Sequence, residues 1–76
     1  MKAYILVNVR TGSIIEVMEN LRRVACVKEV NMTFGPYDVV VIVETEDIKA
    51  LGGVIARDIQ PIPGILETLT CLIVDM

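Results

Sequence analysis

Five apolar residues in a row, Val39 to Val43, constrain the fold of this chain more than any other segment. Successive side chains of a β-strand point to opposite faces, so both faces of a strand formed here would be apolar. A strand of that kind is normally buried on both sides. Asp38 and Glu44 flank the run, and such charges limit aggregation of an apolar segment. The sequence therefore predicts a strand with a covering layer on each face.

The other elements follow the order strand, helix, strand, strand, helix, strand. The period of the apolar residues predicts strands over residues 2–10, 25–34, 37–45 and 65–75, and helices over residues 11–23 and 45–59. This is the order of the ferredoxin-like βαββαβ unit, an α+β fold in which a four-stranded antiparallel sheet carries two helices on one face. One such unit accounts for residues 1–76 as a single domain.

Sequence signals at the helix ends and in the second helix are also specific. Ser13, with Glu16 three residues later, has capping-box spacing, and Thr45 is the expected cap of the second helix. Gly52 and Gly53 fall inside the second helix, where each Gly costs about 0.5–1 kcal/mol relative to Ala. Two explanations stay open: close approach of this helix to the sheet or the other helix, or exposed backbone that lines a ligand or subunit contact.

Size and composition together predict a homodimer. A chain of 76 residues is near the small end of what folds alone, and a domain of roughly this size buries only about 60% of the surface that its unfolded form exposes. Yet hydrophobic residues make up 54% of the chain, above the roughly 45–50% of typical soluble domains. Because both helices are expected on one face of the sheet, a second copy is the expected cover of the other face.

The composition also argues against several classes of function. The chain has no histidine and no phosphate-binding glycine motif, so we expect no enzyme activity, no metal and no cofactor. The net charge is −3 without a basic cluster suited to phosphates, which argues against direct DNA binding. The apolar runs are too short for a membrane span, and we expect a cytoplasmic protein. Cys26 and Cys71 should be reduced, and the sequence leaves open whether they lie close together.

Two sets of polar residues could form a binding site. Gly35 and Pro36 signal a turn, and Asp38 follows it. Asp38 could accept hydrogen bonds from its own turn, or it could bind the ammonium of an amino acid whose carboxylate meets the turn amides. Thr68 and Thr70 alternate on the last strand and share a face, which suits a polar pocket or an ordinary half-exposed strand equally.

Three segments carry a family resemblance: "AYILVNV", "TFGPYDVVVIVETED" and "IPGILETLTCLIV". The second resembles the Gly-x-Tyr/Phe-Asp turn and the following apolar strand of the effector (RAM) domain of Lrp/AsnC-type regulators. The third is similar to that domain's closing segment, an Ile-Pro-Gly turn followed by a spaced pair of threonines. The resemblance covers essentially the whole chain.

The resemblance implies an assembly and a ligand site. It implies a domain that dimerises through its sheets, builds larger rings from dimers, and binds small effectors, typically amino acids, between dimers. The positions that match the family motifs are Gly35, Tyr37, Asp38, Thr68 and Thr70. Full-length members begin with a helix-turn-helix domain, whereas this chain begins at the first strand, so it resembles the stand-alone form. We therefore expect no direct DNA binding, and mixed assembly with full-length regulators stays open.

Two other protein classes share the predicted topology. ACT-like regulatory modules usually have an Asp-x-x-Gly-type turn after the first strand, and "VRTGSI" lacks the Asp. Small dimeric α+β-barrel enzymes generally depend on a polar pocket with His, Tyr or Arg, and Tyr4, Tyr37 and Arg10 leave that alternative open.

Overall fold

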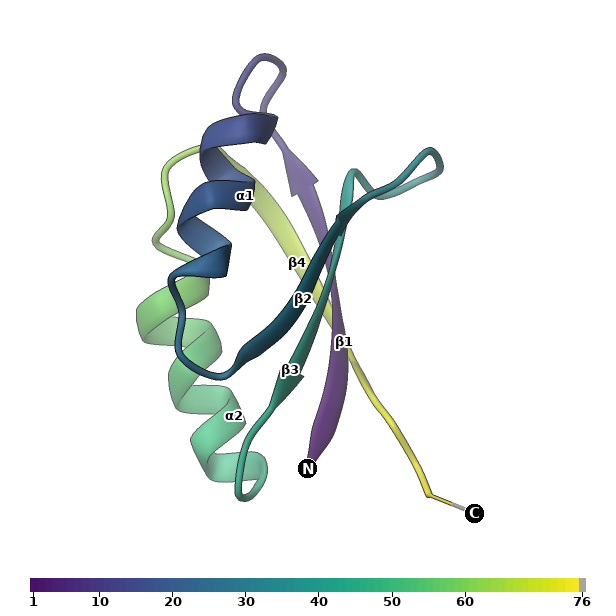
Figure 1. The fold of residues 1–76 in the computed structure, drawn as a ribbon, viewed down its shortest axis with the longest axis vertical. Helices are drawn as coiled ribbons and strands as arrows, with labels where there is room; N and C mark the ends of the chain where they lie inside the picture. The colour runs from purple at the N-terminus through teal and green to yellow at the C-terminus, as the bar shows by residue number, and fades with distance from the viewer. Residues whose placement is uncertain (76) are drawn as a thin grey trace.

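The structure, a computed structural model, describes residues 1–75 and has one four-stranded antiparallel sheet with all of its helical segments on one side (Figure 1). In chain order its elements are β1 (Lys2–Val9), α1 (Ile14–Arg22), β2 (Val27–Met32), β3 (Val39–Glu44), α2 (Ile48–Val54), the π-helical turn η1 (Ile55–Ile59) and β4 (Ile65–Leu72). The strands lie in the order β2-β3-β1-β4. The predicted βαββαβ order and α+β fold are confirmed.

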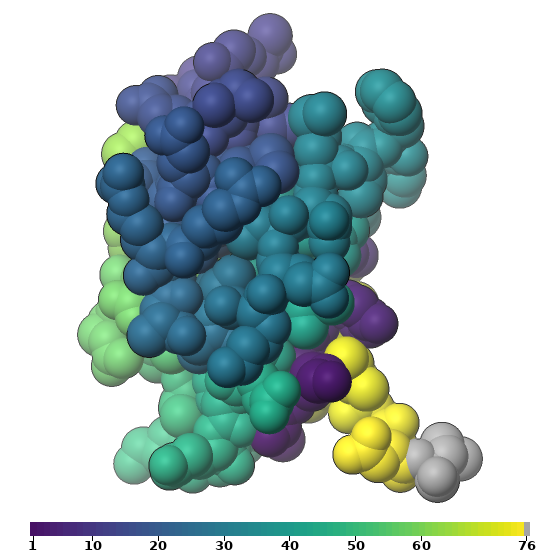
Figure 2. Space-filling model, viewed as in Figure 1, coloured from purple at the N-terminus to yellow at the C-terminus, as the bar shows by residue number. Residues whose placement is uncertain are grey.

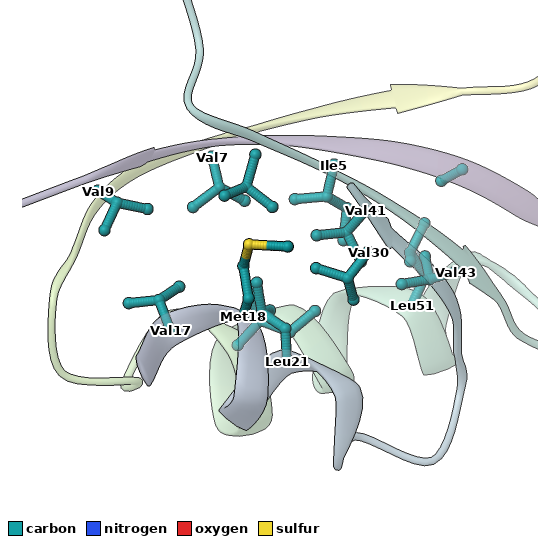
Figure 3. Packing of buried hydrophobic residues seen from close by; sticks show 13 residues of the cluster. Ile5, Val7, Val9, Val17, Met18, Leu21, Val30, Val41, Val43 and Leu51 are labelled. Carbon is teal, nitrogen blue, oxygen red and sulfur yellow. The ribbon is translucent and has the colours of Figure 1, made fainter. Parts of the chain in front are cut away.

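The hydrophobic core fills the space between the sheet and the helices (Figure 3). Alternate residues of β1 and β3 point toward the helices, and Val17, Met18 and Leu21 of α1 meet them from the other side. Val41 of β3 is fully buried among them, as its period-2 pattern predicts. The strand residues of this layer are Ala3, Ile5, Val7, Val9, Val30, Val39, Val41 and Val43.

Neither helix start makes the predicted capping hydrogen bond. Ser13 occupies the N-cap position of α1, but its side chain caps no amide, so the predicted capping box with Glu16 does not form. The cap of α2 is Asp47, whose Oδ1 accepts a hydrogen bond from the Ala50 amide at 2.8 Å. Thr45 lies two residues too early, and its hydroxyl donates to the Asp47 carbonyl at 3.0 Å. A carboxylate directly before the first helical residue is the better acceptor for the free amides.

The second helix is not one continuous α-helix. After Val54 the chain widens into η1, where the Gln60 amide donates to the Ile55 carbonyl at 2.8 Å, five residues back. Among the apolar residues of these two segments, Leu51 and Ile59 are buried, whereas Ile48 is 59% exposed. Turns of the π type are found frequently at functional sites.

No helix among residues 1–75 covers the face of the sheet away from α1 and α2 (Figure 1), and the side chains on that face are largely apolar. Tyr4 pairs with Ile42 on one side and with Cys71 on the other, so the three side chains share this face. Leu69 is 46% exposed on the same face. We call this surface the open face; its central residues are Tyr4, Leu6, Val40, Ile42, Leu69 and Cys71. The second covering layer that the apolar β3 requires is therefore not supplied by residues 1–75.

The two cysteines lie at opposite edges of the sheet. Cys26 directly precedes β2 and Cys71 lies in β4, and both are free thiols. Three interstrand spacings separate these edges, about 14 Å in all, which is too far for a disulfide within one chain. Burial raises the pKa of the Cys26 thiol, and the charge of Asp58 adds to the effect. Cys26 is thus protonated at neutral pH and a poor nucleophile.

Candidate functional site

Asp38 joins the start of β3 to the end of β1. Its Oδ2 accepts a hydrogen bond from the Val9 amide at 2.7 Å, and its own amide donates to the Val7 carbonyl at 2.9 Å. The Val9 bond spans 29 positions of the sequence. A half-buried carboxylate at the head of an apolar strand therefore has a structural partner, and this partner is not an amide of its own turn. The interpretation that Asp38 closes its turn through its side chain is wrong in that detail.

The turn before Asp38 is held by Thr33. The Thr33 amide donates to the Asp38 carbonyl at 2.9 Å, and the Thr33 hydroxyl donates to the Tyr37 carbonyl at 2.8 Å. The amides of Phe34, Gly35 and Tyr37 donate to no other group in residues 1–75. The turn is thus fixed at its base and presents unpaired donors at its tip.

The same turn also offers an acceptor. Within residues 1–75 the side-chain hydrogen bonds of Asp38 engage Oδ2 alone, so Oδ1 can accept a further bond. Gly35 is exposed and Tyr37 is half-buried. Free amides beside a free carboxylate oxygen are complementary to the carboxylate and the ammonium of an amino acid.

Thr68 and Thr70 share a face of β4, as their spacing predicts, and it is the helix-facing side. Thr68 pairs with Val7 and Thr70 pairs with Ile5, and both β1 residues are buried against the helices. Gln60 donates from Nε2 to the Thr68 hydroxyl at 3.3 Å. Both threonines are half-buried, because β4 is an edge strand that the helices cover only in part.

One copy of the chain does not bring the two sets of predicted site residues together. Val7 pairs with Val39 on one side and with Thr68 on the other, so β1 lies between the turn and the threonines. Two interstrand spacings amount to about 10 Å. Asp38 precedes Val39, whose side chain is buried toward the helices, so Asp38 starts on the opposite side of the sheet from the threonines.

A groove between α2 and β4 is a feature that the sequence analysis missed. It has a volume of about 290 Å³. Its lining is almost wholly apolar, with the Thr70 side chain at one wall: Ile48, Leu51, Gly52, Ile55, Thr70 and Leu72. In this arrangement Thr70 lies beside exposed apolar surface rather than in a closed polar pocket.

Gly52 was the one sequence signal of this groove. A Cβ added at Gly52 would meet no atom within 4 Å. At Gly53 it would meet only the Arg57 side chain, whose guanidinium lies 3.2 Å away. Close approach of this helix to the sheet or to α1 is therefore not the reason for the glycine pair. Of the two explanations, exposed backbone at a contact is the one that fits Gly52.

The part of the chain that the structure describes contains no cluster of three or more Cys, Asp or Glu side chains suited to a metal ion. None of the helices among these residues has the length and hydropathy to span a membrane.

Comparison with known proteins points to one family. The profile described as "Lrp/AsnC ligand binding domain" matches residues 2–76. A search of curated proteins gives no match. The solved structure of FFRP-DM1 is similar, with 37% identity over 96% of this chain and 97% of that chain and a TM-score of 0.91. A hypothetical protein of Pyrococcus horikoshii, PHS023, has 37% identity over 97% of this chain and 90% of its own, with a TM-score of 0.88.

A more distant structure shares the fold alone. The transcriptional regulator NMB0573 of Neisseria meningitidis, solved as a complex with L-Met, has 15% identity and a TM-score of 0.85. The match covers 97% of this chain and 49% of the regulator.

Proposed function

The chain belongs to the Lrp/AsnC ligand-binding domain family, and on that premise we propose that it binds an amino acid or a similar small effector between assembled dimers. Domains of this family are regulatory, typically non-enzymatic, oligomerise and bind effectors. In the proposed complex Asp38 accepts from the ammonium of the ligand, and the turn around Gly35 and Tyr37 donates to its carboxylate. Thr68 and Thr70 come from a neighbouring copy.

One observation carries this proposal. Asp38 keeps one carboxylate oxygen free, and three amides of the turn that precedes it have no partner among residues 1–75. A carboxylate that accepts from an ammonium and a backbone amide that donates to a carboxylate both form charge-assisted hydrogen bonds, which are stronger than those between neutral groups. Because the Val9 amide fixes Oδ2 and Thr33 fixes the base of the turn, these groups are positioned before any ligand arrives.

The side chain of the ligand is proposed to be apolar. Leu72 and Ile48 expose apolar surface beside Thr70, the threonine that lines the α2–β4 groove. The distant relative solved with L-Met has the same fold. An aliphatic or thioether side chain is therefore the first class to test.

A melting-temperature screen with the twenty amino acids tests this proposal. A ligand at 100 times its dissociation constant stabilises the folded state by about 2.7 kcal/mol, which in a domain of this size raises the melting temperature by roughly 10 °C or more. The matched control is the N-acetyl derivative of the best amino acid, which lacks the ammonium and should give little shift. A screen in which no amino acid raises the melting temperature contradicts the proposal.

The proposed assembly starts from a homodimer that packs open face against open face. Two copies related by a twofold axis would cover Val40 and Ile42 of each other and supply the missing second layer over β3. We further propose that dimers join into rings and that full-length Lrp/AsnC-type regulators are possible members of mixed assemblies. The net charge of −3 supports no direct DNA binding by this domain.

Leu69→Glu should dissociate this dimer. Leu69 is already 46% exposed in one copy, so the isolated fold tolerates the change, but the dimer would bury the new charge without a partner. We expect the dimer dissociation constant to rise at least about tenfold, as for a central contact residue. Light scattering at micromolar protein concentration measures the mass and therefore the dissociation of the dimer. Ile15→Glu, at a 66% exposed site on α1, is the control and should leave the mass unchanged. An unchanged mass for Leu69→Glu excludes the open face as the dimer surface.

A further inference from the structure

We propose that Phe34 of one copy inserts into the α2–β4 groove of a copy in a neighbouring dimer. This proposal rests on the proposed assembly of dimers and states which surfaces join one dimer to the next. It assigns a function to two features that neither the core nor the open face explains: an exposed aromatic side chain and an uncovered apolar groove.

Phe34 is the only phenylalanine of the chain and is fully exposed. It lies in the β2–β3 turn, whose tip stands away from the body of the molecule in Figure 2, at the upper right in teal. The hydrogen bonds of Thr33 hold the base of this turn, so the ring is presented on an ordered loop. Exposed aromatic side chains of this kind are typical anchors of protein–protein contacts.

The groove is large enough for a phenyl ring. A cavity of about 150 Å³ lined by aliphatic side chains binds benzene, and this groove has about 290 Å³. Gly52 lines the groove without a side chain, and no atom lies within 4 Å of where its Cβ would stand. Ile48 and Leu72 at its rim are 59% and 45% exposed, so they have apolar surface left to bury.

The ring and the groove of one copy cannot meet. Phe34 lies in the turn before β3, whereas Ile48 follows the end of β3. Leu72 pairs with Ala3, which lies at that second end of the sheet. The six residues of β3 span roughly 17–20 Å. The projecting turn and α2 also lie at opposite ends of the molecule in Figure 1. The occupant of the groove must therefore come from another chain, and this chain supplies a fitting one.

The contact joins two different surfaces, so it can repeat from dimer to dimer. A contact between unlike patches generates closed rings or open filaments, in contrast to the self-complementary open face. It also places Tyr37 and Asp38 of one copy, next to the inserted Phe34, beside Thr70 of the other, which lines the groove. The two halves of the predicted ligand site, separated within one chain, would then share one interface.

Two single substitutions test the contact from its two sides. Phe34→Ser removes the ring, and Gly52→Leu fills the groove. Leu at position 52 meets no neighbour within 4 Å at its Cβ and replaces a poor helix former, so this variant should melt no lower than the parent. Light scattering without any ligand should show the parent above the mass of a dimer and each variant at the mass of a dimer. The protein concentration needed for assembly should rise at least tenfold.

Controls separate this contact from the dimer and from ligand binding. Met32→Ser, at a 55% exposed site at the end of β2, should assemble like the parent. Leu69→Glu combined with Phe34→Ser removes both contacts and should yield monomers rather than dimers. An equal mixture of the Phe34→Ser and Gly52→Leu variants should regain mass, because the first retains the groove and the second retains the ring.

Three outcomes overturn the proposal. They are a parent that stays dimeric, a Phe34→Ser or Gly52→Leu variant that assembles like the parent, and a mixture of the two variants that regains no mass. No amino acid is present, so a failed ligand screen leaves this test intact.

Discussion

Asp38→Asn should weaken amino-acid binding by roughly ten- to more than a hundredfold while the protein stays folded. A charge-assisted contact contributes about 1.5–3 kcal/mol, which corresponds to that range of affinity. The amide side chain keeps one oxygen that can accept from the Val9 amide, the bond now made by Oδ2 at 2.7 Å. It loses the negative charge that would bind the ammonium. Calorimetric titration of the best amino acid from the screen measures the change.

Asp38→Ala separates the structural role of this residue from its binding role. Without an acceptor, the partly buried Val9 amide is left unpaired, and the free energy of unfolding should fall by about 1–3 kcal/mol. Glu44→Gln, an exposed carboxylate at the other end of β3, is the control and should change neither quantity. If Asp38→Asn binds like the parent and only Asp38→Ala melts early, Asp38 is a structural acceptor and the proposed ammonium contact is wrong.

Gly64→Ala should lower the free energy of unfolding by about 3 kcal/mol, a large share of the roughly 5–15 kcal/mol of a typical domain. Gly64 has a φ of +99°, where an L side chain is strained by about 1–2 kcal/mol. Its Cβ would also lie 2.8 Å from the Ser13 Cβ and 2.9 Å from Val17 Cγ2. Val17 is fully buried, so α1 would have to move, and overpacking of this kind costs about 1–3 kcal/mol.

Gly12→Ala is the matched control for this effect. Gly12 has a φ of +86° but no atom within 4 Å of an added Cβ, so only the backbone strain applies. Chemical denaturation of both variants should show a cost of about 1–2 kcal/mol at position 12 and a clearly larger one at position 64. Equal losses would mean that the contact between the loop before β4 and α1 relaxes freely, contrary to the packing described above.

Local periodicity was enough to predict the fold. The alternation of β1 and the spacing of Val17 and Leu21 depend on which face of an element is buried, and that information lies within ten residues of sequence. The doubly apolar β3 also predicted that the side of the sheet without helices needs a cover, and the structure places Val40 and Ile42 on that side with none supplied by residues 1–75. Such features are decided by the burial of many side chains, so no single contact has to be known.

Other features could not be predicted from the sequence because each of them depends on a single hydrogen bond or on how the elements pack together. The Val9 amide is 29 positions away from Asp38, and no local pattern predicts that bond. The cap at Asp47 in place of Thr45 and the π-turn after Val54 are choices between neighbouring hydrogen-bond partners of similar strength. The groove beside Gly52 arises where α2 fails to cover the edge strand β4, which depends on how the elements pack rather than on their own sequences.

The separation of Asp38 from Thr68 and Thr70 has a consequence for how such a protein reports on its effector. If each complete site needs two copies, occupancy and self-association are linked equilibria, and each must strengthen the other by the same factor. The apparent affinity for the effector should then rise with the concentration of the protein itself. A dilute pool would respond weakly and a concentrated pool sharply, so the abundance of the chain would set the threshold of its response.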